Sequence, residues 1–272
     1  MFDPLLSTLS LVSRFPIKVK FTFDPSRIDF FLPLTGILPA VLGGLVFFLA
    51  GTLRAGPTLT ALLILTVQYF GFNLFHLDGL IDTADAFLGT FDREKRLAIL
   101  KDPRIGVYGF FTGTAVLALK WALVCGLCPR IPRFPAALLA YPISGRFGAA
   151  LLPGMAKPLK AGGLGALMKD AKPRRAAGGT LLGLGLWAAL VHGGAALYAA
   201  SPFSGNPPPL RGTPLPWLLL LGLPLSAIPV SWLTARRYTG GLGGYTGDAL
   251  GTAVELGELI HLGAAAVILA FW

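Results

Sequence analysis

The sequence predicts an all-α fold: a polytopic bundle of about seven transmembrane helices with a cytoplasmic N-terminus. Of the 272 residues, 54% are hydrophobic and 13% are charged, whereas a soluble domain carries about 25% charged residues. The mean hydropathy is +0.69. Such a chain has too little polar surface to cover a particle in water, and its length suits one compact bundle. We therefore expect residues 1–272 to form a single integral membrane domain.

Seven segments are apolar and long enough, or nearly so, to cross a membrane, which takes about 20 residues. They lie at about residues 32–53, 57–76, 107–128, 134–153, 177–201, 215–234 and 249–271. The stretch between the fifth and sixth segments is rich in proline and glycine, which indicates an exposed outer loop.

The basic residues predict the orientation. With a cytoplasmic N-terminus, the four inner segments hold four, five, six and two Lys or Arg residues, 17 in all, against four in the outer loops. This asymmetry follows the positive-inside rule and supports an odd number of spans. It also explains the net charge of +10 without nucleic acid as a partner.

Residues 1–31 are only moderately apolar, and a leucine-rich stretch in them precedes Arg14. This pattern predicts an interfacial amphipathic helix that ends near Pro16.

The most informative segment begins at His76 and contains Asp78, Asp82 and Asp85. Their spacing places three carboxylates on one face of a helix, over a rise of about 10 Å. Like charges at this spacing repel each other, and no basic residue lies within the run. A divalent cation would remove the conflict, and oxygen ligands suit Mg²⁺ or Mn²⁺. We predict a metal site at the three aspartates, with a solvated helix end as the alternative. His76 borders them as a base or as a packed helix-end residue.

A second acidic cluster, formed by Asp248, Glu255 and Glu258, lies near the other end of the chain. Thr246 or Asp248 suits a helix N-cap. The two glutamates lie one to two turns inside the seventh span, where they must pair with a cation or be protonated. Because this helix and the aspartate loop share the cytoplasmic side, we predict one site from both clusters, within residues 76–106 and 235–258.

Several cations could complete this site. Lys101 and Arg104 could bind phosphate oxygens, Arg104 in bidentate fashion, although a solvated loop is the alternative. Arg146 lies inside the fourth span and needs an anionic partner, which the acids or a phosphate could supply. Lys157 belongs to a glycine-rich basic loop that could cradle a phosphate or act as a lid. Lys120, within the third span, is interpreted as structural.

Carboxylates, a divalent metal and nearby cations are typical of phosphoryl transfer, and a membrane face suits an amphiphilic or very large substrate. In these motifs the sequence resembles the cobalamin synthase family, the adenosylcobinamide-GDP ribazoletransferases. The resemblance covers essentially the full chain. It rests on residues 76–85, 100–109, 243–251, Glu255 and Glu258, and more weakly on residues 14–16 and 163–165.

The resemblance implies a Mg²⁺-dependent reaction in which α-ribazole, or its 5′-phosphate, attacks the phosphorus joined to cobinamide and GMP leaves. It implies metal ligands at Asp78, Asp82 and Asp85. The remaining implied roles are catalytic for Asp82, Asp248, Glu255, Glu258 and His76, and substrate-binding for Arg14, Lys101, Arg104, Arg146, Lys157 and Thr246. The expected location is the cytoplasmic (inner) membrane, with the site on the cytoplasmic face. Membrane lipid, other late corrinoid-assembly enzymes and a second copy of the chain are candidate partners.

Two alternatives use similar residues. A CDP-alcohol phosphotransferase-like lipid enzyme also places aspartates at a helix end, but that class carries an arginine after its Asp-Gly pair, which is missing after Asp78 and Gly79. A cation transporter would place acids near the bilayer midplane, with helix breaks in paired positions, whereas the aspartates here lie toward one side.

Overall fold

The computed structural model describes residues 2–14, 16–199 and 214–271, and within these ranges the regular elements are all helices, as predicted. The helices are α1 (Asp3–Val12), α2 (Ile28–Thr35), α3 (Ile37–Thr52), α4 (Pro57–Gln68), α5 (Leu74–Gly89), α6 (Arg93–Ile99), α7 (Val107–Leu127), α8 (Pro135–Leu138), α9 (Tyr141–Leu151), α10 (Pro173–Ala199), α11 (Leu215–Gly222), α12 (Ala227–Leu242) and α13 (Gly247–Ala270). A π-helical turn, η1 (Tyr69–Asn73), joins α4 to α5. Most of the predicted outer loop lies outside the described residues.

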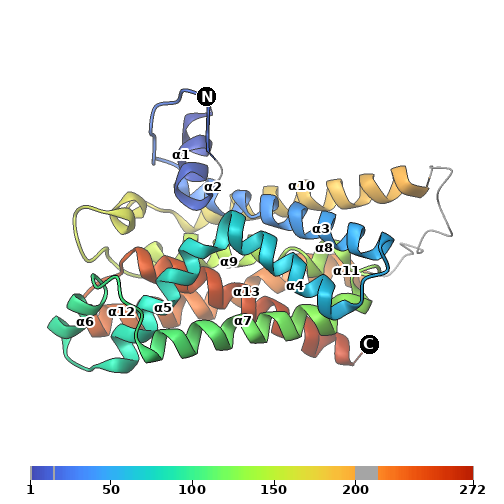
Figure 1. Ribbon diagram of the computed structural model, residues 1–272. Coiled ribbons are helices and arrows are strands. Elements are labelled where there is room, and N and C mark those ends of the chain that lie inside the picture. The colour runs from blue at the N-terminus through green and yellow to red at the C-terminus, as the bar shows by residue number, and fades with distance from the viewer. Residues whose placement is uncertain (1, 15, 200–213, 272) are drawn as a thin grey trace.

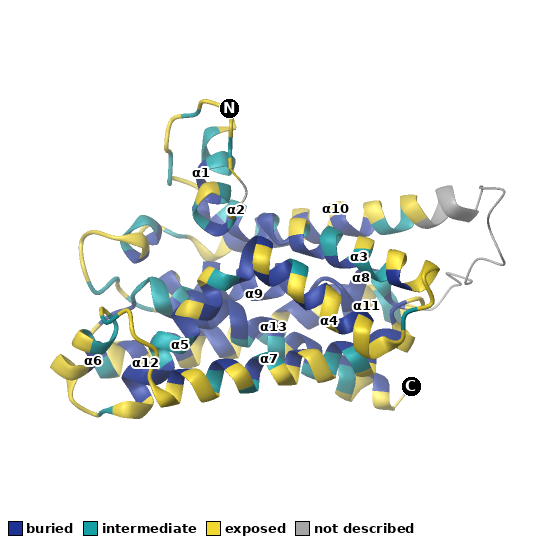
Figure 2. Cartoon of the chain, in the orientation of Figure 1, coloured by how far each residue is buried: buried dark blue, intermediate teal, exposed yellow. Residues whose placement is uncertain are grey.

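In the described ranges, six continuous helical stretches are long and apolar enough to cross a membrane. They are Ile28–Thr52, Pro57–Gly89, Val107–Arg130, Pro173–Gly194, Leu215–Leu242 and Gly247–Ala270. The outward faces of α3, α7 and α10 carry exposed residues (Figure 2). Many of these are apolar, such as Leu45, Phe111 and Leu186. Apolar side chains on an outer surface suit a lipid environment, so the chain is an integral membrane protein.

The fourth predicted span is not a continuous membrane-spanning helix, and here the structure corrects the sequence prediction. Residues 134–153 form the short helices α8 and α9, which are separated at Leu139 and Ala140. Pro142 lacks an N–H group for bonding to the preceding turn, which favours the break. All of α9 is buried, and it packs against α2, α10, α12 and α13 at the centre of the bundle. This segment is therefore surrounded by protein rather than by lipid.

The connections that carry the basic residues gather at one end of the bundle, on the left in Figure 1. They are the α5–α6–α7 connections and the loop between α9 and α10, and the second half of α12 adds Arg236 and Arg237 at the same end. The C-terminus lies at the opposite end. The predicted N-terminal helix is present as α1, which ends at Val12, earlier than predicted, and packs against α2.

Candidate functional site

The two predicted acidic segments meet because glycines let α5 and α13 touch. A Cβ atom on Gly79 would lie 2.9 Å from the Cα of Asp248, and one on Gly251 would lie 2.8 Å from the carbonyl oxygen of His76. Small residues at helix crossings let membrane helices approach this closely. The aspartates of α5 and Asp248 at the start of α13 therefore share one end of the bundle, as predicted.

The carboxylate of Asp82 lies within electrostatic reach of Asp78, Asp85 and Asp248. Asp78 is exposed, and Asp82 and Asp248 are partly exposed. Within the described ranges, none of these four aspartates takes part in an ion pair. No ion pair with a protein cation thus offsets their mutual repulsion in this part of the chain, and a bound cation would relieve it.

The donor chemistry at Asp78, Asp82 and Asp248 fits Mg²⁺. No three Asp, Glu, His or Cys side chains in the described ranges already converge on one point. Magnesium sites, however, usually use one or two carboxylates and take their other oxygens from water and substrate phosphates. The carboxylate group is therefore suited to an ion that is shared with a phosphorylated ligand.

Asp85 has partners that the sequence did not reveal. Its carboxylate accepts hydrogen bonds of 2.8 Å from the backbone N–H groups of Gly106 and Gly109. These amides begin α7, where a negative charge is stabilising. A Cβ atom on either glycine would collide with the Asp85 carboxylate. The two glycines thus approach Asp85, which fixes the start of α7. The metal role of Asp85 stays a prediction.

Thr246 was predicted at this site, but the neighbouring hydroxyls of Thr83, Tyr238 and Thr252 were missed from the sequence. Thr246 occupies the N-cap position of α13 but donates its hydroxyl hydrogen bond to the Asp248 carboxylate, at 2.9 Å. The Thr252 hydroxyl donates to the Thr83 hydroxyl at 2.8 Å. The Thr83 hydroxyl in turn lies 2.6 Å from the Tyr238 hydroxyl. The spacing of these hydroxyl residues along each helix does not reveal the cluster, because their hydrogen-bond partners come from other helices.

A cavity of ≈ 180 Å³ lies beside Asp248. Lys101, Lys160, Thr246 and the glycine-rich stretch 162–165 line it together with Asp248. Two cations and a chain of backbone amides thus border the carboxylates, an arrangement that suits an anionic ligand. Of the predicted substrate-binding residues, Lys101 and Thr246 line this cavity, whereas Lys157 does not and Lys160, from the same loop, does.

The glycine-rich loop is held against the α12–α13 turn by Tyr245. The backbone N–H of Tyr245 donates to the Lys157 carbonyl oxygen at 2.9 Å, and the carbonyl oxygen of Tyr245 accepts from the Leu159 N–H at 2.8 Å. The Tyr245 hydroxyl donates to the Gly165 carbonyl oxygen at 2.8 Å. Burial raises the pKa of Tyr245 to about 12, so this hydroxyl remains a donor at physiological pH.

Two predicted substrate-binding arginines lie apart from the cavity lining. The Arg104 side chain is 86% exposed and its guanidinium forms an ion pair with Asp102, with Nη2 and Oδ2 2.6 Å apart. This guanidinium lowers the pKa of Asp102 to about 2. Arg14 is also exposed, and its backbone N–H donates to the Gly71 carbonyl oxygen in the π-helical turn.

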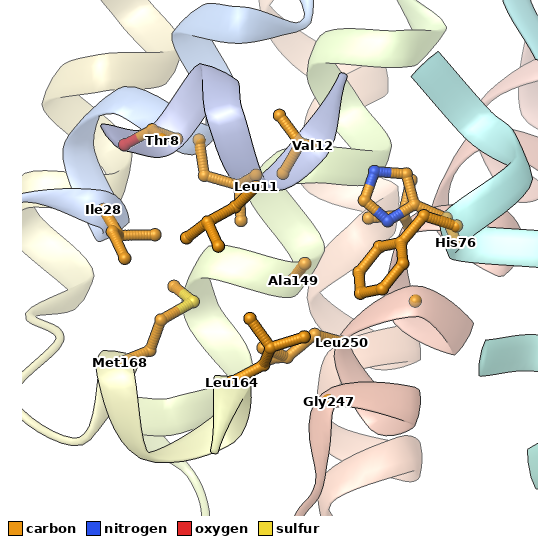
Figure 3. Close-up of a pocket in the computed structure, with 14 residues that line it drawn as sticks. Thr8, Leu11, Val12, Ile28, His76, Ala149, Leu164, Met168, Gly247 and Leu250 are labelled. Atoms are coloured by element: carbon orange, nitrogen blue, oxygen red, sulfur yellow. The ribbon is translucent and has the colours of Figure 1, made fainter. Parts of the chain in front are cut away.

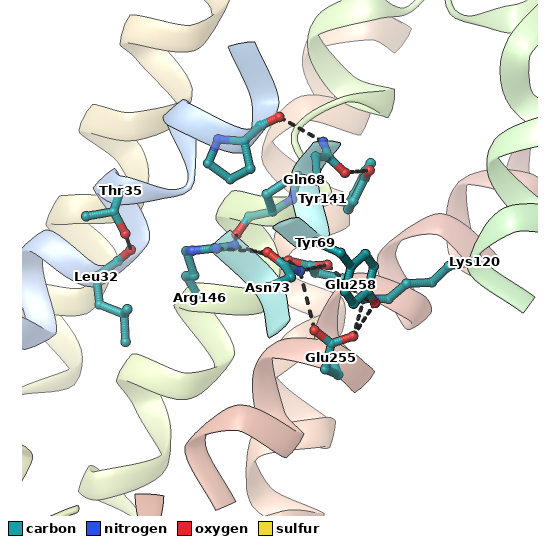
Figure 4. A network of polar contacts seen from close by, with 12 residues as sticks. Leu32, Thr35, Gln68, Tyr69, Asn73, Lys120, Tyr141, Arg146, Glu255 and Glu258 are labelled. Atoms are coloured by element: carbon teal, nitrogen blue, oxygen red, sulfur yellow. Dashed lines mark hydrogen bonds and ion pairs between the residues drawn. The ribbon is translucent and has the colours of Figure 1, made fainter. Parts of the chain in front are cut away.

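Glu255 and Glu258 belong to a separate ion-pair network in the bundle interior (Figure 4). Lys120 on α7 lies 2.7 Å from Glu255 and 2.8 Å from Glu258, and Arg146 on α9 lies 3.1 Å from Glu258. Asn73 donates to Glu258 at 2.9 Å. The two carboxylates are thus matched by two cations, which is the first of the two alternatives predicted for them.

This network corrects the prediction of a single site built from both acidic clusters. Only Asp248 joins the aspartates of α5, since Glu255 lies about 10 Å further along α13 and its partners differ. Arg146 is fully buried, so it does not extend toward a helix end. Lys120, interpreted as structural, turns out to bridge both glutamates.

Comparisons with known proteins agree with the resemblance in these motifs. The family model described as cobalamin-5-phosphate synthase matches residues 4–266. The chain belongs to the cobalamin-5-phosphate synthase family. A member from Pseudomonas entomophila, named adenosylcobinamide-GDP ribazoletransferase, is 36% identical over 95% of this chain and 96% of its own. One of the same name from Thermosipho melanesiensis is 36% identical over 61% of this chain and 68% of its own. No solved structure matches.

The cobalamin-5-phosphate synthase match spans every residue of the site described above. It includes the aspartates of α5, the cavity-lining lysines and Asp248, as well as the buried ion-pair network. The family assignment therefore applies to the whole bundle and not to one of its ends alone.

Proposed function

We propose that the chain is an adenosylcobinamide-GDP ribazoletransferase. It transfers adenosylcobinamide phosphate from adenosylcobinamide-GDP to α-ribazole, or to its 5′-phosphate, and releases GMP in the last assembly steps of cobalamin synthesis. The observation that carries the proposal is the uncompensated carboxylate group of Asp78, Asp82 and Asp248, beside a cavity lined by lysines. The family match favours this reaction over the CDP-alcohol and transporter alternatives.

In this reaction a hydroxyl oxygen of the ribazole bonds to the phosphorus that carries cobinamide, and the bond from that phosphorus to the GMP oxygen breaks. Asp82 and Asp78 would hold Mg²⁺, which would neutralise charge on the diphosphate. Lys101 and Lys160 line the cavity and would bind phosphate oxygens.

The remaining step is to take up the proton of the attacking hydroxyl. Asp248 is suited to it, because its carboxylate lines the cavity and is oriented by the Thr246 hydroxyl. The buried glutamates are less suited, since Lys120 and Arg146 already engage them. A carboxylate that is free of cations keeps its capacity to accept a proton.

The site belongs at the cytoplasmic face of the cytoplasmic membrane on this proposal. The loops that carry most basic residues lie at the same end of the bundle as the aspartates (Figure 1), and basic loops favour the cytoplasmic side. This placement would give the corrinoid and ribazole substrates access to the cavity from the cytoplasm.

The test compares Asp82→Ala with Asp170→Ala in isolated membranes. Asp170 is an exposed residue of the loop before α10, so it serves as the matched control. With adenosylcobinamide-GDP, α-ribazole and a Mg²⁺ titration, the wild type and the control should release GMP and the Asp82 variant should not. Both variants should insert into the membrane equally. Turnover by the Asp82 variant at the wild-type rate would show that the metal proposal is wrong.

A further inference from the structure

A second, mainly apolar cavity of ≈ 50 Å³ lies between α1, α2, α5, α9 and α13 (Figure 3). Its lining is contributed by residues that are far apart in the sequence, and most of them are apolar. Among them are Leu11, Val12, Ile28, Leu32, Phe75 and Met168. The reaction described above assigns this cavity no role.

One polar group in this lining has no partner. His76 is 4% exposed, and its Nε2 atom makes no hydrogen bond within the described part of the protein. The hydroxyl of Thr8, also in the lining, already donates to the Pro4 carbonyl oxygen at 2.8 Å. A buried polar atom without a partner is costly. His76 borders the cavity (Figure 3), and its ring lies against that of Phe75. A ligand there could therefore supply the missing bond.

The apolar cavity adjoins the cavity beside Asp248. Leu164 and Gly247 line both of them. A ligand whose polar part lies near Asp248 can therefore extend an apolar part past Leu164 toward His76. The two cavities together offer carboxylates and lysines at one end and an apolar lining with one free ring nitrogen at the other.

We propose that the apolar cavity binds the aromatic base of the ribazole and that His76 Nε2 forms a hydrogen bond with the unsubstituted ring nitrogen of that base. This inference rests on the proposed function. Ribazoles are ribosides of benzimidazoles, which are flat and apolar apart from one nitrogen acceptor. A neutral imidazole can donate to such an acceptor. A lipid acyl chain would fill the same lining but would leave His76 without a partner.

Binding requires one wall to move, because a cavity that holds a benzene ring measures about 150 Å³. Leu164 is the wall that is best placed to do so. It is 39% exposed, and it follows Gly163, which has a φ of +89° and no neighbouring atom within 4 Å of a built Cβ. A shift of Leu164 would enlarge the apolar cavity and open it toward Asp248.

The experiment measures binding of two ribosides to the full chain in detergent. One is α-ribazole, and the other is its indole analogue, in which a C–H group replaces the unsubstituted ring nitrogen. The wild type should prefer α-ribazole by about three- to tenfold, the range expected for one net hydrogen bond. His76→Phe should lose the preference, and His76→Gln, which offers an amide in place of the ring N–H, should regain part of it.

A variant outside the buried core keeps the inference testable if His76→Phe does not fold. Leu164→Trp should weaken binding of both ribosides about tenfold, because a larger side chain at the shared wall blocks the entrance. Equal affinity of the wild type for the two ribosides, with displacement of both by a fatty acid, would assign the cavity to an acyl chain.

The inference and the proposed function fail separately. GMP release from adenosylcobinamide-GDP by the wild type tests the function. If the wild type turns over while His76→Phe keeps the full preference for α-ribazole, the role of His76 is wrong. If the wild type shows the preference but releases no GMP, the proposed function is wrong and the base-binding cavity stands.

Discussion

Replacing Lys120 with methionine would test whether the buried ion-pair network holds the bundle together. Lys120 is fully buried, and its ammonium group lies 2.7 Å from Glu255, 2.8 Å from Glu258 and 3.1 Å from the Tyr69 hydroxyl. Methionine has a similar length and no charge. The substitution therefore keeps most of the packing but leaves two carboxylates with Arg146 as their one remaining cation.

The expected cost follows from this geometry. Removing one partner of a buried ion pair destabilises a protein by about 3–5 kcal/mol, because the other charge is left uncompensated. Lys95→Met, at an exposed position in α6, should change stability by no more than about 0.5 kcal/mol. A double variant, Lys120→Met with Glu255→Gln, restores the charge balance and should recover about 1–3 kcal/mol.

The assay is unfolding of the detergent-purified chain, followed by loss of helical circular dichroism. A loss of 3–5 kcal/mol corresponds to a decrease in Tm of about 6–20 °C for a chain of this size. A Lys120→Met protein as stable as Lys95→Met would refute the reasoning. So would a double variant less stable than Lys120→Met alone, because the charge imbalance would then not be the cause of the loss.

Three further predictions concern the loops at the acidic end. Asp29 is buried and lies 2.8 Å from Arg175, so Asp29→Asn should loosen the loop before α10 and speed its cleavage by trypsin severalfold in a time course. Gly109→Ala should lower the free energy of unfolding by about 1–3 kcal/mol, because the new methyl group would collide with Asp85; a calorimetric Tm equal to that of the wild type would contradict this. Since the raised pKa of Tyr245 favours its neutral hydroxyl in the folded state, the Tm advantage of the wild type over Tyr245→Phe should be present below pH 10 and disappear as the pH rises toward 12.

Much of the fold could be predicted from the sequence because bilayers impose strict length and charge rules. Apolar length located α7, α10 and α13 to within a few residues, and the basic loops indicated which connections share an end. The same topology brought Asp248 to the aspartates of α5. Helical spacing alone was enough to place Asp78, Asp82 and Asp85 on one helix.

Hydropathy failed at residues 134–153 because it measures apolar content and not the path of the backbone. The helices α8 and α9 are apolar because other helices surround them, a situation that the sequence does not distinguish from contact with lipid. Asp85 was assigned to a metal for a similar reason. Its partners, Gly106 and Gly109, are backbone amides, and the sequence offered no sign that the start of α7 would reach it.

The acidic residues of α5 and α13 form two sets, which differ in whether a protein cation neutralises them. Glu255 and Glu258 each have a cation within 3.1 Å, so their network with Lys120 and Arg146 carries no net charge and these acids need no further ion. Asp78, Asp82 and Asp248 have no such partner within the described ranges, although they lie at an end where lysines are abundant. A protein under no other constraint would lower its free energy by placing one of those lysines beside Asp82. Instead, this end of the bundle has carboxylates at its centre and lysines at its edge. A site that binds a cation together with a diphosphate, and then releases both, needs this arrangement of charges.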